Sequence, residues 1–155
     1  MEDNLTDNRL FFNSFDNFYE WCYSVKDNKF RINILHLNIR SLAKHWDTLK
    51  IQLVSSETCF DVIVLSEIFS DEYRLALFNL PGYNKFFYLR KNKEGGGLVM
   101  FVNNSKLQFT HIPINNITTY EHITGELELV QSKSKAFKFA IHAVYRPPTS
   151  SSGYT

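Results

Sequence analysis

Two short stretches, Arg31-Ile-Asn-Ile-Leu-His-Leu-Asn38 and Asp61-Val-Ile-Val-Leu-Ser-Glu67, decide the fold of this chain. Each is an apolar run of β-branched and aliphatic residues bounded by polar ones, and a segment with helical spacing separates them. This arrangement predicts two neighbouring buried strands. If the strands run parallel, their C-terminal ends share one edge of the sheet, where open α/β sheets bind ligands. We therefore expect Asn38 and Glu67 to meet at that edge.

The segment between the two strands predicts a helix. Ser41 is a suitable N-cap, and Ala43, Trp46, Leu49 and Leu53 follow at helical spacing, so we expect them on the face that packs on the sheet. A second amphipathic helix is expected within 12–25, where Phe and Cys recur at the same period. Its expected role is to cover the sheet, and partner binding is the alternative.

The second half of the chain predicts short strands rather than helices. A helical turn is expected over 71–77, and the expected strands are 83–89, 98–102, 107–112, 123–130 and 136–145. The first two of these strands would form a hairpin with a basic, Gly-rich tip. A strand–helix–strand unit followed by antiparallel hairpins predicts an α/β fold with one mixed sheet and helices on one face.

Length and composition fit one domain with a real core. The chain has 155 residues, of which 44% are hydrophobic, and its formal net charge is +1. A charge so close to zero means that any DNA binding must come from local patches. Two distant cysteines, no signal peptide and no membrane-spanning stretch indicate an intracellular protein.

Three groups of residues carry possible chemistry, each with a simpler alternative. One carboxylate and one amide oxygen, from Glu67 and Asn38, suit Mg²⁺, although such residues also end strands without any ligand. Gly95-Gly-Gly97 follows Arg90, Lys91 and Lys93, and in one interpretation these three cations of the loop approach phosphate. Composition alone favours a flexible hairpin tip. His36 shares a strand face with Asn38, and a core histidine is the simpler interpretation.

Five motifs occur in a specific order between positions 32 and 148. They are Leu37-Asn-Ile-Arg-Ser-Leu42, Leu65-Ser-Glu67, Leu80-Pro-Gly-Tyr83, Arg90 with Gly95-Gly-Gly-Leu98, and Val144-Tyr-Arg-Pro-Pro148. In this order they resemble the endonuclease domain of non-LTR retrotransposons of the jockey-like kind. That domain belongs to the endonuclease/exonuclease/phosphatase superfamily, which has a DNase I-like fold.

The resemblance implies a four-layer α/β/β/α sandwich and Mg²⁺- or Mn²⁺-dependent cleavage of DNA, without a small-molecule cofactor or a membrane. It assigns Asn38 and Glu67 to the metal and places Tyr145 near the scissile phosphate. Arg90, Lys91, Lys93 and Arg146 would contact the DNA backbone, an assignment that rests on charge. A full-length relative would be nuclear and fused to a reverse transcriptase.

The chain also departs from this family. The family's Asp-x-Asn and Ser-Asp-His motifs, which supply the water-activating Asp and a His, do not occur. We therefore expect an N-terminal extension over 1–30, a partial domain over 31–148 truncated to roughly its first sheet and flanking helices, and a disordered tail over 149–155. The expected product is an inactive endonuclease fragment. The alternatives are a non-catalytic module that binds nucleic acid or protein, and a degenerate mobile-element relic.

Overall fold

The two apolar stretches over 31–38 and 61–67 form parallel neighbouring strands in the computed structural model. The structure describes residues 14–25, 31–55, 60–90, 95–114, 120–130 and 138–146. Strand β1 (Ile34–Asn38) pairs with β2 (Val62–Ser66) in parallel, and Asn38 lies opposite Ser66. Both strand C-termini therefore lie at one edge of the sheet, as predicted.

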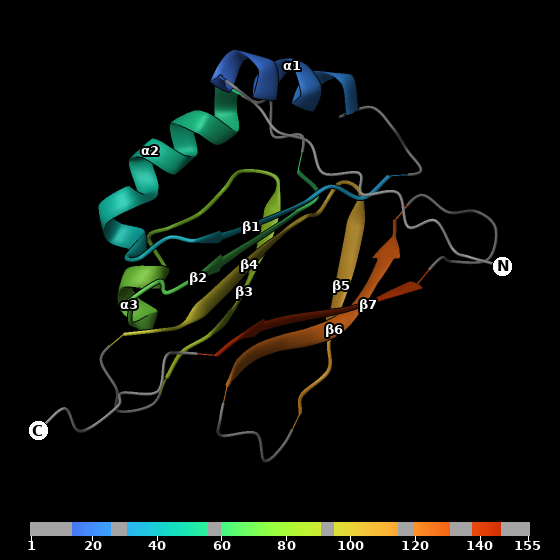
Figure 1. Cartoon of the computed structure of the whole chain (residues 1–155). Coiled ribbons are helices and arrows are strands. Elements are labelled where there is room, and N and C mark those ends of the chain that lie inside the picture. The colour runs from blue at the N-terminus through green and yellow to red at the C-terminus, as the bar shows by residue number, and fades with distance from the viewer. Residues whose placement is uncertain are drawn as a thin grey trace, which may run out of the picture.

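The β3–β4 hairpin completes this first sheet, as predicted. β3 (Tyr83–Tyr88) pairs antiparallel with β4 (Leu98–Asn103), and β4 pairs antiparallel with β2. The strand order is β1-β2-β4-β3, so β2 and β4 are central (Figure 1). All five residues of β2 are buried, and so are the first five of β4.

Within the described residues, three helices cover one face of the first sheet: α1 (Phe15–Val25), α2 (Leu42–Ser55) and α3 (Glu72–Leu75) (Figure 1). The buried face of α2 follows the predicted helical spacing with one change: Leu42 is buried, whereas Ala43 is exposed. Leu42 lies seven residues, about two turns, before Leu49 and so shares its face, whereas Ala43 lies six residues before Leu49 and falls about 120° around the helix from it. Cys22 of α1 is fully buried in the same core, so α1 packs on the domain.

The remaining strands form a second sheet, which differs from the single mixed sheet and from the truncation to roughly a first sheet that the sequence led us to expect. β5 (Leu107–His111), β6 (Glu121–Leu129) and β7 (Lys138–Tyr145) pair antiparallel in the order β5-β6-β7. The architecture is thus mixed α/β with two sheets, and the second sheet packs on the face of the first that the helices leave free (Figure 1).

The cause of this second layer is that the central strands are apolar on both faces. Ile63 and Phe101 face the helices, while Val64 and Met100 face the second sheet. A strand that is apolar on both sides must be covered on both sides, because exposed apolar area costs about 25 cal/mol per Å². The cover comes from a set of apolar residues of the second sheet: Leu107, Phe109, Ile123 and Leu127.

Lys106 holds the corner where the chain passes from the first sheet to the second. Its Nζ donates to Asp61 Oδ2 at 2.9 Å and to the carbonyl oxygen of Arg31 at 2.6 Å. The backbone N–H of Asn33 also donates to Asp61 Oδ2, at 2.8 Å. Asp61 is buried, so this carboxylate needs these partners to offset its desolvation.

The predicted tail over 149–155 and the first residues of the N-terminal extension lie outside the described residues. None of the helices in the described ranges has the length and apolar character needed to cross a membrane.

Gly125 is the position where the second sheet tolerates no side chain. It lies opposite His111 on β5, and a Cβ there would collide with the carbonyl oxygen of Thr110 and come within 2.5 Å of Phe109 Cζ. Because a backbone atom must move, we expect Gly125→Ala to lower the free energy of unfolding by about 2–3 kcal/mol, measured by urea denaturation.

Gly82→Ala is the matched control for this prediction. A Cβ at Gly82 meets nothing within 4 Å, and only its φ of 82° opposes the substitution. We expect a loss of about 1 kcal/mol there. Equal losses at both positions would contradict the packing argument.

Candidate functional site

Three residues that the sequence singled out come together at the C-terminal edge of β1 and β2. Asn38 is the last residue of β1, Glu67 follows β2 directly, and Tyr145 is the last residue of β7. The phenol of Tyr145 donates a hydrogen bond to Glu67 Oε1, and the side chain of Asn38 lies close enough to lower the pKa of Glu67. Glu67 is thus held from both sheets.

Backbone hydrogen bonds continue past the ends of the strands and fix this edge. The N–H of Ile39 donates to Ser66 O at 3.0 Å, and the N–H of Ser41 donates to Glu67 O at 2.8 Å. On the other side, the N–H of Phe69 donates to Gly96 O at 3.0 Å. The segment that carries Glu67 is therefore bound on both sides by other segments.

Backbone strain is concentrated at the same edge. In the described ranges, the four non-glycine residues with left-handed φ are Arg40 (46°), Ser41 (101°), Glu67 (56°) and Phe69 (47°). Residues other than glycine rarely adopt this conformation, and it persists only where surrounding contacts hold it. Such strain clusters at functional sites, so it is a second indication, independent of residue type, that this edge is one.

The environment of Glu67 favours its charged form. The hydrogen bond from Tyr145 is the largest cause that lowers the pKa of Glu67 below its ordinary 4.5, followed by the side chain of Asn38. Burial opposes the shift, and the charge of Arg40 adds to it. Glu67 is therefore an ionised acceptor at neutral pH.

The environment of Tyr145 has the opposite effect. Burial, then the hydrogen bond to Glu67 and the negative charges of Glu67 and Glu121, raise the pKa of Tyr145 to about 12, and Arg90 partly opposes them. The phenol remains protonated at neutral pH, so it serves as a hydrogen-bond donor and not as a base.

The four predicted phosphate-contact residues have different positions. Arg146 follows Tyr145 and is exposed. Arg90 is mostly buried and forms an ion pair with Glu121. Lys91 and Lys93 lie outside the described residues. Phosphate contact stays a prediction for all four.

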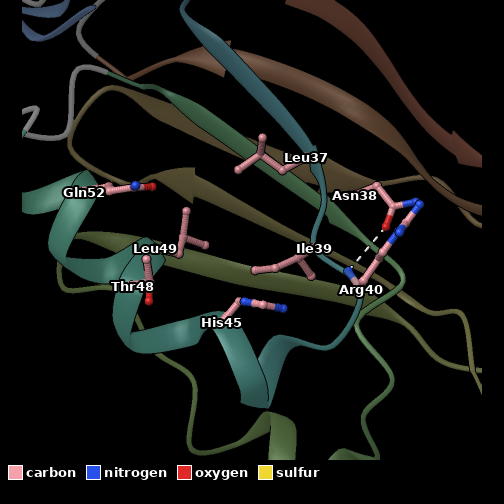
Figure 2. A pocket seen from close by; sticks show the side chains of 8 residues that line it. All are labelled: Leu37, Asn38, Ile39, Arg40, His45, Thr48, Leu49 and Gln52. Atoms are coloured by element: carbon pink, nitrogen blue, oxygen red, sulfur yellow. Dashed lines mark hydrogen bonds between the residues drawn. The ribbon is translucent and has the colours of Figure 1, made fainter. Parts of the chain in front are cut away.

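Hollows lined by described residues lie on two sides of the site. One, of about 370 Å³, lies between the end of β1 and helix α2 and is bordered by Asn38 and Arg40. In Figure 2 these two side chains lie next to each other at one end of it, and the Arg40 N–H donates to Asn38 Oδ1 at 3.3 Å. The other, of about 890 Å³, lies between 69–74 and Gly95–Gly97 and includes Arg90. The edge is therefore accessible from both sides.

The oxygen donors at the edge suit a hard cation that keeps most of its water. Glu67 offers a carboxylate and Asn38 an amide, which is the small donor set that Mg²⁺ accepts. Within the described residues, no group of three or more His, Cys, Asp or Glu side chains is arranged to hold a metal.

Sequence reasoning missed Glu121 as a residue of this site. It is 2% exposed, and its Oε2 accepts the Gly97 N–H at 2.7 Å. A glutamate at the start of an alternating strand reads as a solvated polar position, and its burial depends on how the two sheets pack. The sequence feature that could have indicated the burial of Glu121 is a cation able to pair with it, Arg90.

Comparison of the chain with protein-family models and with curated proteins gives no match. The chemical interpretation of the site therefore depends on its geometry and on the ordered motifs.

The pKa of Tyr145 provides a direct test of this geometry. In an NMR titration of ¹³Cζ-labelled tyrosines, we expect Tyr145 to titrate at about pH 12, and Glu67→Gln to lower that midpoint because the negative charge of the acceptor is lost. The folded pKa lies above the ordinary 10.0, so the stability contributed by Tyr145 is complete below pH 10 and is lost as the pH rises through about 12.

Tyr145→Phe assigns the signal, since it removes that resonance alone. A Tyr145 midpoint that Glu67→Gln leaves unchanged would show that the two groups do not interact in solution.

Proposed function

We propose that the Asn38–Glu67–Tyr145 edge is the metal-binding part of a Mg²⁺-dependent DNA phosphodiesterase site, in a DNase I-like fold related to the endonuclease domain of non-LTR retrotransposons. One observation supports this most directly. The side chains of Asn38 and Tyr145 converge on the carboxylate of Glu67, and the motif resemblance marks all three residues. Two packed sheets with helices on one outer face are compatible with three layers of such a sandwich.

Each residue has a role that follows from its protonation state. Glu67, kept ionised, and the amide oxygen of Asn38 would hold the metal. When bound, the ion would supply positive charge that neutralises the phosphate and the leaving 3′ oxygen. Tyr145, kept neutral, would donate a hydrogen bond to a phosphate oxygen. Arg146, exposed beside it, would contact the DNA backbone together with Lys91 and Lys93.

The metal assignment is tested by binding. We expect Glu67→Gln to weaken Mg²⁺ or Mn²⁺ binding about 10-fold or more, measured by isothermal titration calorimetry, because the carboxylate charge is lost. The control is Asp47→Asn, which neutralises an exposed carboxylate on α2 and should leave the affinity unchanged. The same affinity in both variants would remove Glu67 from the metal site.

We propose further that this 155-residue chain does not cleave DNA, because the sequence lacks the Asp-x-Asn and Ser-Asp-His motifs that would activate water. With Mg²⁺ and supercoiled plasmid, we expect no nicking above that of Glu67→Gln. Nicking that requires Glu67 would overturn the inactivity and strengthen the phosphodiesterase assignment.

The alternative, a non-catalytic nucleic-acid module, keeps the basic residues and dispenses with the metal. The triple variant Lys91→Ala/Lys93→Ala/Arg146→Ala tests this alternative. Loss of DNA binding at low salt in the triple variant, together with unchanged DNA binding in Glu67→Gln, would support it.

A further inference from the structure

Glu121 is a buried carboxylate that bridges the two sheets. It starts β6 in the second sheet and is 2% exposed. Its Oε2 accepts the N–H of Gly97, which leads into β4 of the first sheet, at 2.7 Å. Its Oε1 forms an ion pair with Arg90 Nε, beyond the end of β3. A carboxylate buried in this way requires its charge partner, because burial of an unpaired charge is strongly unfavourable.

Gly96 fits around this ion pair and leaves no room for a side chain. A Cβ at Gly96 would collide with Glu121 Oε1 and come within 2.9 Å of Arg90 Nε. Its φ of 75° also lies in the left-handed region that favours glycine. The Gly95–Gly97 segment is thus packed against an ion pair, a different role from that of a flexible tip or an open phosphate loop.

The same segment holds the backbone next to Glu67. The carbonyl oxygens of Gly96 and Gly97 accept the N–H groups of Phe69 and Ile68, at 3.0 and 3.3 Å. Hydrogen bonds therefore lead from the Glu121 carboxylate through Gly97 to the residue after Glu67. Glu67 itself has a left-handed φ of 56°, which neighbouring contacts must maintain.

Glu121 is also next to Tyr145. The two residues are directly opposite each other on β6 and β7, so their side chains leave the sheet on the same face. From this face, Tyr145 reaches Glu67 and Glu121 reaches Gly97. One end of the second sheet therefore contacts the Glu67 edge through two adjacent side chains.

We propose that Arg90 and Glu121 are a positioning pair: their ion pair fixes the second sheet against Gly95–Gly97 and thereby holds Tyr145 in contact with Glu67. The significance of this contact for catalysis rests on the proposed function, whereas the contact itself does not. Arg90 then acts through Glu121, and its role differs from the phosphate contact that its charge suggests.

The test replaces the pair by apolar residues in Arg90→Met/Glu121→Leu, since apolar replacement of a buried ion pair commonly preserves folding. Amide hydrogen exchange by NMR should accelerate about 10-fold or more at Gly97, Ile68 and Phe69, and stay unchanged at the core residues Val64 and Met100. The ¹³Cζ shift of Tyr145 should move to its value in Glu67→Gln.

A matched control removes a second ion pair that has a buried carboxylate, in Asp61→Asn/Lys106→Met. Asp61 precedes β2 and Glu67 follows it, so this pair lies at the opposite end of the strand. We expect the exchange at Gly97, Ile68 and Phe69 and the Tyr145 shift to stay as in the wild type.

Two outcomes would overturn the proposal: an unchanged Tyr145 shift with unchanged exchange at those amides, or equal acceleration at every amide, which would make the pair a contributor to global stability. If the double variant does not fold, the wild-type protein decides: NOEs from the Gly96 Hα protons to Arg90 Hδ and Glu121 Hγ are expected, and their absence refutes the pair. All these measurements omit metal and DNA, so their result is separate from the success or failure of the proposed function.

Discussion

The structure depends on the burial of β2 and β4 on both faces. Every residue from Val62 to Ser66 is buried, with alternate side chains packed on the helices and on the second sheet. Because apolar area must be removed from water on both sides, neither the helix layer nor the second sheet can be dispensed with. The resulting packing of the two sheets also places one end of β6 and β7 at the edge where β1 and β2 end.

This position of the second sheet creates the electrostatic character of the site. Tyr145, near the C-terminal end of the sequence, contacts Glu67. Their hydrogen bond lowers the pKa of Glu67 and raises the pKa of Tyr145, so it favours an ionised carboxylate and a neutral phenol. The resulting acceptor and donor stay in these forms across the neutral pH range. The strained backbone around Arg40, Ser41 and Glu67 persists because hydrogen bonds from neighbouring segments hold it.

The Gly-rich segment shows how packing changes the meaning of a motif. By composition, Gly95–Gly97 beside several cations is a flexible tip or a phosphate loop, and both interpretations treat Arg90 as a solvated charge. In the structure Arg90 is paired with buried Glu121. The pair has room to form because Gly96 carries no side chain that would collide with it. A functional assignment of Arg90 by charge alone therefore overlooks its partner from the other sheet.

The sequence by itself determined the strands, the parallel β1–β2 pair, the helical stripe of Trp46, Leu49 and Leu53, and the convergence of Asn38 and Glu67, because these follow from local periodicity and from one short crossover. Motif resemblance, not periodicity, added Tyr145. Only the tertiary structure decided that the later strands form a separate sheet and that Glu121 is buried against Arg90. Those outcomes depend on contacts between residues far apart in the chain, and alternation within a single strand does not specify which sheet will cover it.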